Sequence, residues 1–108
     1  MNASEFEDKA EHTLEDLFDA FDEAVGDVVD VDFDNSVLTF ELQDGRQYVL
    51  NKHAPNQELW MSSPVSGAAH FAYDSGQDSW KSTRGGESLW TILGAELKQL
   101  TGKSVTKP

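Results

Sequence analysis

The spacing of apolar residues changes period twice along this chain, and those changes limit the folds open to it. Between residues 6 and 25, apolar residues recur every three or four positions, as on one face of an α-helix. From residue 29 to residue 34, valine and phenylalanine alternate strictly with aspartate, which is typical of a half-buried β-strand. Helical spacing returns near the C-terminus with Leu89, Leu93, Leu97 and Leu100. The chain is therefore expected to form a helix, then strands, then a second helix.

Turn-forming residues divide the middle of the chain into short strands. Asn35-Ser36 and Asp44-Gly45 each follow an alternating run, and Asp-Gly is a strong hairpin signal. Five strands are expected, with a short sixth as an option, over residues 29–34, 37–42, 46–51, 58–62, 69–73 and, for the sixth, 80–82. The short connections favour antiparallel neighbours.

The order of these elements predicts an α+β fold in a single domain over residues 1–108. The N- and C-terminal helices would pack on one face of an antiparallel sheet of five to six strands, as a two-layer sandwich. Ser4 and Glu7 have the spacing of a capping box at the start of the first helix. Gly26 and Gly102 are expected to end the two helices. The other face of the sheet would be open to water.

Composition excludes several classes of protein. The chain has no cysteine, so disulfides, thiolate metal sites and cysteine nucleophiles are ruled out. No apolar run approaches the ~20 residues of a membrane span, and a net charge of −12 argues against binding a nucleic-acid backbone. The N-terminal residues are acidic and lack the features of a targeting peptide. We therefore expect a cytoplasmic protein, or a mature form that has already been trimmed.

The acidic residues are distributed very unevenly. Fifteen of the twenty lie in the first 44 positions, where Lys9 is the only basic residue. At about 100° per residue, one stripe of the first helix gathers Asp8, Glu11, Glu15, Asp19 and Asp22, with Glu23 at its edge. Carboxylates one helical turn apart, with strand aspartates nearby, offer the hard oxygen ligands that iron, manganese, calcium and magnesium accept. The alternative is a solvated helix face that keeps the protein soluble.

Strand alternation predicts an exposed aromatic residue on the open face of the sheet. If Leu59 and Met61 face the core, Trp60 must point to the other side. The same alternation places three further polar residues on that face: Asn51, Glu58 and His70. A large aromatic side chain ringed by polar groups resembles a binding hot spot. The alternative is a register shifted by one residue, which would bury Trp60.

The histidines, the serines and the glycine pair suggest no site. His12, His53 and His70 are far apart in the sequence and lack metal-binding spacing, so each is interpreted as a surface or turn histidine. No serine lies in a nucleophile-elbow pattern, and Gly85-Gly86 lacks the pattern of a phosphate-binding loop.

Residues 48–67, with the sequence YVLNKHAPNQELWMSSPVSG, resemble the signature block of the frataxin family. The similarity extends over nearly the whole chain, through the acidic first helix and strand, Trp80 and the closing amphipathic helix. Length and N-terminus resemble the bacterial CyaY branch. His53 and Glu58 stand where glutamine is usual, and His70 stands where mitochondrial members often have arginine. A cationic contact at His70 would therefore depend on pH.

This resemblance implies a small α+β protein of iron–sulfur cluster assembly. Such a protein binds Fe²⁺ and Fe³⁺ weakly on an acidic ridge and docks on the complex of a cysteine desulfurase with an iron–sulfur scaffold protein, whose rate it tunes. Carried over, the ridge would consist of Glu11, Glu15, Asp19, Asp22, Glu23, Asp27, Asp30 and Asp32. The partner-binding residues would be Asn51, Glu58, Trp60 and His70.

The resemblance also sets the remaining expectations. The protein would be a monomer, with iron-dependent oligomers as the alternative, and it would reside in the bacterial cytoplasm, or in the mitochondrial matrix if it is a processed eukaryotic form. Ferroxidase or iron-storage activity is the alternative function, although the sequence has no buried di-iron motif. A third possibility is an acidic decoy for a nucleic-acid-binding protein, which the signature block does not support.

Overall fold

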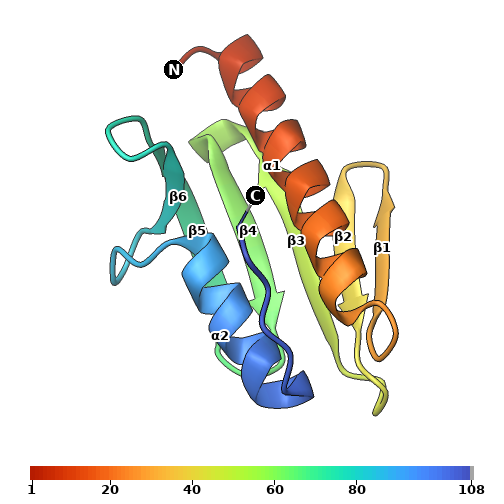
Figure 1. The fold of residues 1–108 in the computed structure, drawn as a ribbon. Coiled ribbons are helices and arrows are strands. Elements are labelled where there is room, and N and C mark those ends of the chain that lie inside the picture. The colour runs from red at the N-terminus through yellow and green to blue at the C-terminus, as the bar shows by residue number, and fades with distance from the viewer. Residues whose placement is uncertain (108) are drawn as a thin grey trace.

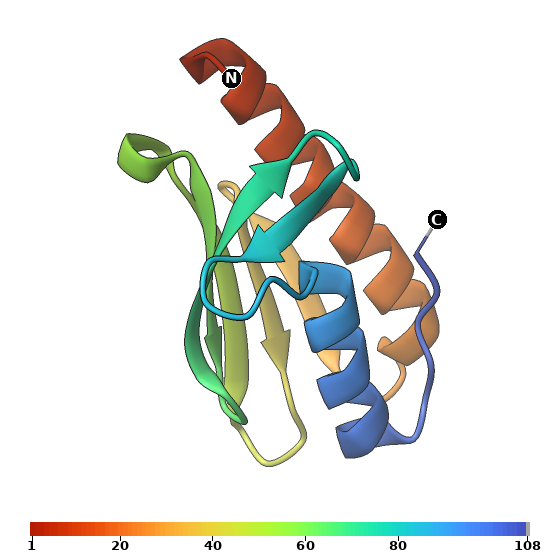
Figure 2. The same ribbon diagram turned by 90° about the vertical axis from the view of Figure 1, so that its left-hand side faces the viewer.

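The computed structural model describes residues 1–107, which form two helices and a six-stranded sheet. In chain order the elements are α1 (Ala3–Val25), β1 (Asp30–Asp34), β2 (Val37–Glu41), β3 (Gln47–His53), the 3₁₀ turn η1 (Ala54–Asn56), β4 (Glu58–Ser63), β5 (Gly67–Asp74), β6 (Ser79–Ser82) and α2 (Leu89–Thr101). The strands follow one another across the sheet in sequence order, and every neighbouring pair is antiparallel. Both helices lie on the same face of the sheet (Figures 1 and 2). The predicted two-layer sandwich is confirmed, and the optional sixth strand is present.

The N-cap of helix α1 lies two residues earlier than predicted. The side chain of Asn2 accepts a hydrogen bond from the Glu5 amide at 2.8 Å, and the Glu5 carboxylate accepts one from the Asn2 amide at 3.3 Å. The predicted capping box at Ser4 and Glu7 was therefore wrong. Asn2 and Glu5 have the same spacing, and asparagine is among the best N-cap residues, so the earlier pair satisfies the first free amides.

The two predicted helix ends are confirmed. Gly26 caps α1, and a Cβ atom there would lie only 2.2 Å from the carbonyl oxygen of Asp22, so no larger residue fits without a shift. Gly102 ends α2 with φ of 77°, a left-handed conformation that favours glycine. Ser88 caps the start of α2 by accepting a hydrogen bond from the Thr91 amide at 3.1 Å.

One continuous apolar core fills the space between the helices and the sheet. The largest of its fully buried side chains are Tyr48, Phe6, Phe21, Phe40 and Phe71. The indole N–H of Trp80 donates to the Thr13 hydroxyl at 2.8 Å, so this buried aromatic finds a polar partner on α1. Leu100, which was expected to continue the apolar row of α2, is 36 % exposed and lies outside the core. None of the helices in the described range has the length and apolar character needed to cross a membrane.

Candidate functional site

The eight predicted metal ligands lie along α1, the loop after it and β1. We call this set the acidic ridge: Glu11, Glu15, Asp19, Asp22, Glu23, Asp27, Asp30 and Asp32. Helix α1 packs beside β1, where the rings of Phe18 and Phe33 are 6.3 Å apart, so the two elements are neighbours as expected (Figure 1). Seven of the eight side chains are exposed, and Glu11 is half-buried.

The ridge follows a corner of the molecule. In β1, Val31 and Phe33 pack toward the helices, so alternation turns Asp30 and Asp32 to the open face of the sheet. Asp30 lies opposite Glu41 of β2, and like charges opposed across strands destabilise the pair. The helical and strand carboxylates thus lie on two sides of the β1 edge. Together they make this region negative, but they do not form a single binding geometry.

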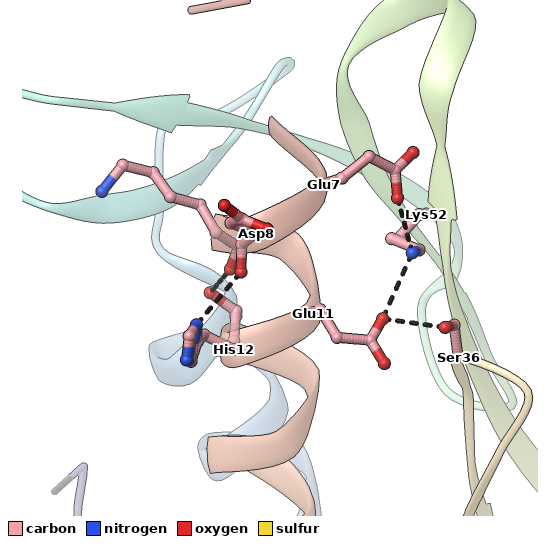
Figure 3. A network of polar contacts seen from close by, with 8 residues as sticks. Glu7, Asp8, Glu11, His12, Ser36 and Lys52 are labelled. Atoms are coloured by element: carbon pink, nitrogen blue, oxygen red, sulfur yellow. Dashed lines mark hydrogen bonds and ion pairs between the residues drawn. The ribbon is translucent and has the colours of Figure 1, made fainter. Parts of the chain in front are cut away.

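A lysine from the sheet occupies the N-terminal end of the ridge. The Lys52 ammonium lies 2.7 Å from a Glu7 oxygen and 3.2 Å from a Glu11 oxygen, as Figure 3 shows. The Ser36 hydroxyl also donates to Glu11 at 2.8 Å. These contacts hold the pKa of Glu11 below its usual value, chiefly through the Ser36 hydrogen bond and then through Lys52. Glu11 is therefore already engaged within the protein.

Asp27, in the loop after α1, is similarly engaged. The Lys103 ammonium lies 2.5 Å from an Asp27 oxygen, and this hydrogen bond is the main reason that the pKa of Asp27 is lowered. Within residues 1–107, the other six ridge carboxylates have no ion-pair partner: Glu15, Asp19, Asp22, Glu23, Asp30 and Asp32. In the same range, no three histidine or carboxylate side chains converge closely enough to hold a metal ion. The ridge is thus a row of separate carboxylates, of which Glu11 and Asp27 are engaged by lysines.

The second predicted surface is centred on Trp60. Leu59 and Met61 are buried, so Trp60 does point to the open face of the sheet, where it is half-buried by its neighbours. Asn51 and His70 lie directly opposite it on β3 and β5. The predicted parity is confirmed, and the shifted-register alternative is wrong.

Two imidazole rings cover the two faces of the Trp60 indole. The ring centroid of His53 is 3.7 Å from that of Trp60, and the centroid of His70 is 4.3 Å away, each at an interplanar angle of 8°. The indole N–H donates to Glu58 at 2.9 Å, and the same carboxylate oxygen lies 3.7 Å from the Nδ1 atom of His70. The four predicted partner-binding residues are therefore together.

His53 is the member of this group that sequence reasoning missed. Its lack of metal-binding spacing predicts only a surface or turn histidine. The contact with Trp60 does not follow from spacing, because it depends on strand register. The alternation of Asn51 and His53 in β3, combined with the pairing of Asn51 and Trp60, was the signal that could have found it. Beside the stack, the open face has a depression of about 170 Å³ lined by Val49, Asn51, Trp60, Met61, Ser62, Ala68 and His70.

A third polar cluster joins α2 to the turn after β4. One oxygen of the Glu96 carboxylate accepts hydrogen bonds from the hydroxyls of Tyr48 and Ser63 at 2.8 and 2.7 Å. The other oxygen accepts one from Ser66 at 2.7 Å. Burial, and then the Glu96 carboxylate, raise the pKa of Tyr48. Sequence reasoning missed this cluster, in which Ser63 and Ser66 share the Glu96 carboxylate as their acceptor.

The fold and these surfaces define a small α+β sandwich protein whose candidate sites lie on its exterior. Residues 1–103 match the frataxin-like domain model, and the chain belongs to that family. It is 39 % identical over 105 residues to the iron-sulfur cluster assembly protein CyaY of Neisseria meningitidis, covering 97 % of this chain and 94 % of that protein. It is 40 % identical over 94 residues to mitochondrial frataxin of Arabidopsis thaliana, covering 87 % of this chain but only half of that protein.

Solved structures show the same fold. Frataxin from Psychromonas ingrahamii matches with a TM-score of 0.86 at 26 % identity, over 100 % of this chain and 99 % of that one. Trimeric frataxin from Saccharomyces cerevisiae, complexed with ferrous iron, matches with a TM-score of 0.78 at 33 % identity, over 88 % and 87 % of the two chains. The similar proteins thus include bacterial and mitochondrial members, and both predicted locations of this protein stay predictions.

Proposed function

We propose that this protein binds iron weakly on the acidic ridge and acts as an accessory protein or regulator of iron–sulfur cluster assembly. In that role it would dock on the complex of a cysteine desulfurase with an iron–sulfur scaffold protein. The observation that carries the proposal is the row of six exposed ridge carboxylates without ion-pair partners in residues 1–107. The names of the CyaY relative and of the iron-complexed yeast structure support it.

The donor chemistry of the ridge suits weakly held, hydrated iron. Asp19 is one helical turn from Glu15, Asp22 and Glu23, a spacing that brings Cβ atoms to about 5–6 Å. Two carboxylates at that distance can contact one hydrated ion, while water supplies the remaining ligands. Because no third side chain converges within residues 1–107, each such site would exchange its ion easily. An easily exchanged site suits a protein that passes iron on.

The metal half of the proposal can be tested by titrating Fe²⁺ without oxygen and following the backbone amide signals. We expect line broadening to be strongest at Asp19, Asp22 and Asp30, and weak at Glu11, whose carboxylate is held by Lys52 and Ser36. A matched control is Glu87→Gln, which removes an exposed acid remote from the ridge in sequence and should leave the titration unchanged. Undisturbed signals along the ridge would refute iron binding there.

The docking half rests on charge and on the open sheet face. A one-signed field of this kind steers the protein toward a basic surface, while the ring edges around Trp60 offer an aromatic contact that a partner can bury. Reversing charge in Asp19→Lys/Asp22→Lys should abolish binding to an immobilised cysteine desulfurase–scaffold complex at moderate salt. Glu87→Lys makes the same kind of change off the ridge and should bind nearly as well as the unmodified protein. Equal binding by all three proteins would contradict the docking proposal.

Ferroxidase or iron-storage activity is the weaker alternative. The trimeric yeast frataxin with ferrous iron favours keeping it, together with iron-dependent oligomers. Oxidation would have to occur on exposed carboxylates that do not converge in threes within the described range. Oxygen consumption with excess Fe²⁺ decides the question, because a rate no higher than that of free iron removes this alternative.

A further inference from the structure

The open face of the sheet around Trp60, which we call the docking face, carries two ionisable rings in direct contact with this tryptophan. His53 and His70 lie on opposite faces of Trp60, nearly parallel to it, at 3.7 and 4.3 Å between ring centroids. Since the indole lies between them, the two imidazoles cannot bind one metal ion together. A partner's side chain cannot stack on the Trp60 indole unless it displaces a histidine. A partner therefore meets the edges of the three stacked rings.

The charged groups around the stack are few. On β4, Glu58 is the carboxylate that contacts it; its side chain is 16 % exposed and is held by the Trp60 N–H. On β3, Lys52 points to the opposite face and is paired with carboxylates of α1. On β6, the ammonium of Lys81 is hydrogen-bonded to Gln77. Arg84 lies beyond Thr83, whose amide donates to the His70 carbonyl at 2.9 Å, and its side chain is exposed.

We propose that the His53–Trp60–His70 stack is a proton-controlled charge switch on the docking face. Histidine as a residue type changes charge between about pH 5 and 8. With both imidazoles neutral, the stack and the Glu58 carboxylate that contacts it together carry one negative charge; with both protonated, the same four side chains carry one positive charge. An imidazolium on an indole face is a favourable cation–π contact, and His70 would also pair with Glu58. Protonation therefore recharges the face. His70 can keep its place because Glu58 lies beside it, whereas the Nδ1 atom of His53 is buried without a hydrogen-bond partner within residues 1–107, so a proton there requires the ring to shift toward water.

At low pH the switch gives the acidic ridge and the docking face opposite charges. The acidic ridge stays negative throughout pH 5–8, because carboxylates are ionised in that range. The Trp60 face becomes positive, so a basic partner that spans both surfaces is attracted by one and repelled by the other. For such a partner, docking should weaken about tenfold between pH 8 and pH 5.5. The expected loss of affinity rests on the proposed docking function, whereas the change in charge of the docking face does not.

The recharging can be measured on the protein alone. Iodide and caesium ions quench accessible indoles with opposite dependence on local charge, and the contribution of Trp60 is obtained by comparison with Trp60→Phe. From pH 8 to pH 5.5, quenching of Trp60 by iodide should rise and quenching by caesium should fall. The change should disappear in His53→Gln/His70→Gln and persist in His12→Gln, whose imidazole lies against α1. A ratio of the two quenching constants that does not vary with pH, or varies equally in the double variant, overturns the proposal.

Docking at both pH values then separates the switch from the function that uses it. The unmodified protein should lose affinity for the desulfurase–scaffold complex at pH 5.5, while His53→Gln/His70→Gln should lose much less. An equal loss in both proteins overturns the switch even if the docking function holds. Absence of docking at every pH refutes the proposed function instead, and the quenching ratio still decides whether the face is recharged.

Discussion

Replacing Glu96 with alanine should destabilise the fold although Glu96 is only partly buried. Its carboxylate is the hydrogen-bond acceptor for Tyr48, which is fully buried, and for Ser63, which is 7 % exposed. A buried hydroxyl left without an acceptor costs about 1–3 kcal/mol, and the exposed Ser66 can turn to water. We therefore expect Glu96→Ala to lower the free energy of unfolding by about 2–4 kcal/mol.

Thermal and urea denaturation followed by circular dichroism would measure this loss. For a domain of this length, about 4 °C of Tm accompanies each kcal/mol, so Tm should fall by about 8–16 °C. Gln99→Ala is the matched control, since it adds an alanine to an exposed position of the same helix and should change stability by less than about 0.5 kcal/mol. Glu96→Gln keeps one acceptor oxygen and should fall between the two.

A double-mutant cycle with Tyr48→Phe tests whether the hydrogen bonds are the cause. Tyr48→Phe alone should cost about 1–2 kcal/mol, and its effect should shrink to near zero once Glu96 is alanine, giving a coupling energy of about 1–2 kcal/mol. If the two losses simply add, or if Glu96→Ala is as mild as Gln99→Ala, the hydroxyl cluster does not stabilise the turn after β4. The reasoning from buried hydroxyls would then be refuted.

Three further predictions follow from the same kinds of contact. Lys52→Gln should release Glu7 and Glu11, so Mn²⁺ used as a paramagnetic probe should broaden their amide signals more than in the unmodified protein; unchanged broadening would contradict the pairing. Because the pKa of Glu11 is lowered in the folded state, its stabilising effect is present above about pH 4.5 and is lost as pH falls; Ser36→Ala should reduce this acid sensitivity in urea melts. Because the pKa of Tyr48 is raised, its contribution is present below about pH 10 and is lost as pH rises further, a slope that Tyr48→Phe should remove.

Much of the fold was predictable because its determinants are local. Turn residues and the alternation of apolar side chains placed every strand to within two or three residues, and the Leu59–Trp60–Met61 sequence fixed the direction of Trp60. The first residue of α1 was harder to predict, because Asn2 and Ser4 both offer a capping side chain. Only the structure shows which backbone amides need a cap.

The polar clusters were missed because their members are distant in sequence. Lys52 meets Glu7 across 45 positions, and Ser63 meets Glu96 across 33. Neither pair follows from a local period; each requires the packing of a helix against a particular strand. The exposed ridge carboxylates were predictable from helical spacing alone, but the engagement of Glu11 was not.

Strand β3 explains how the two proposed surfaces are related. Lys52 and His53 are consecutive, and alternation sends their side chains to opposite faces of the sheet. Lys52 pairs with Glu11 at the N-terminal end of the ridge, while His53 covers one face of Trp60. A one-residue change of register in β3 would exchange these roles and disturb both surfaces together. The middle of the ridge, around Asp19 and Asp22, has no such tie to β3, so charges can be altered there without changing the docking face.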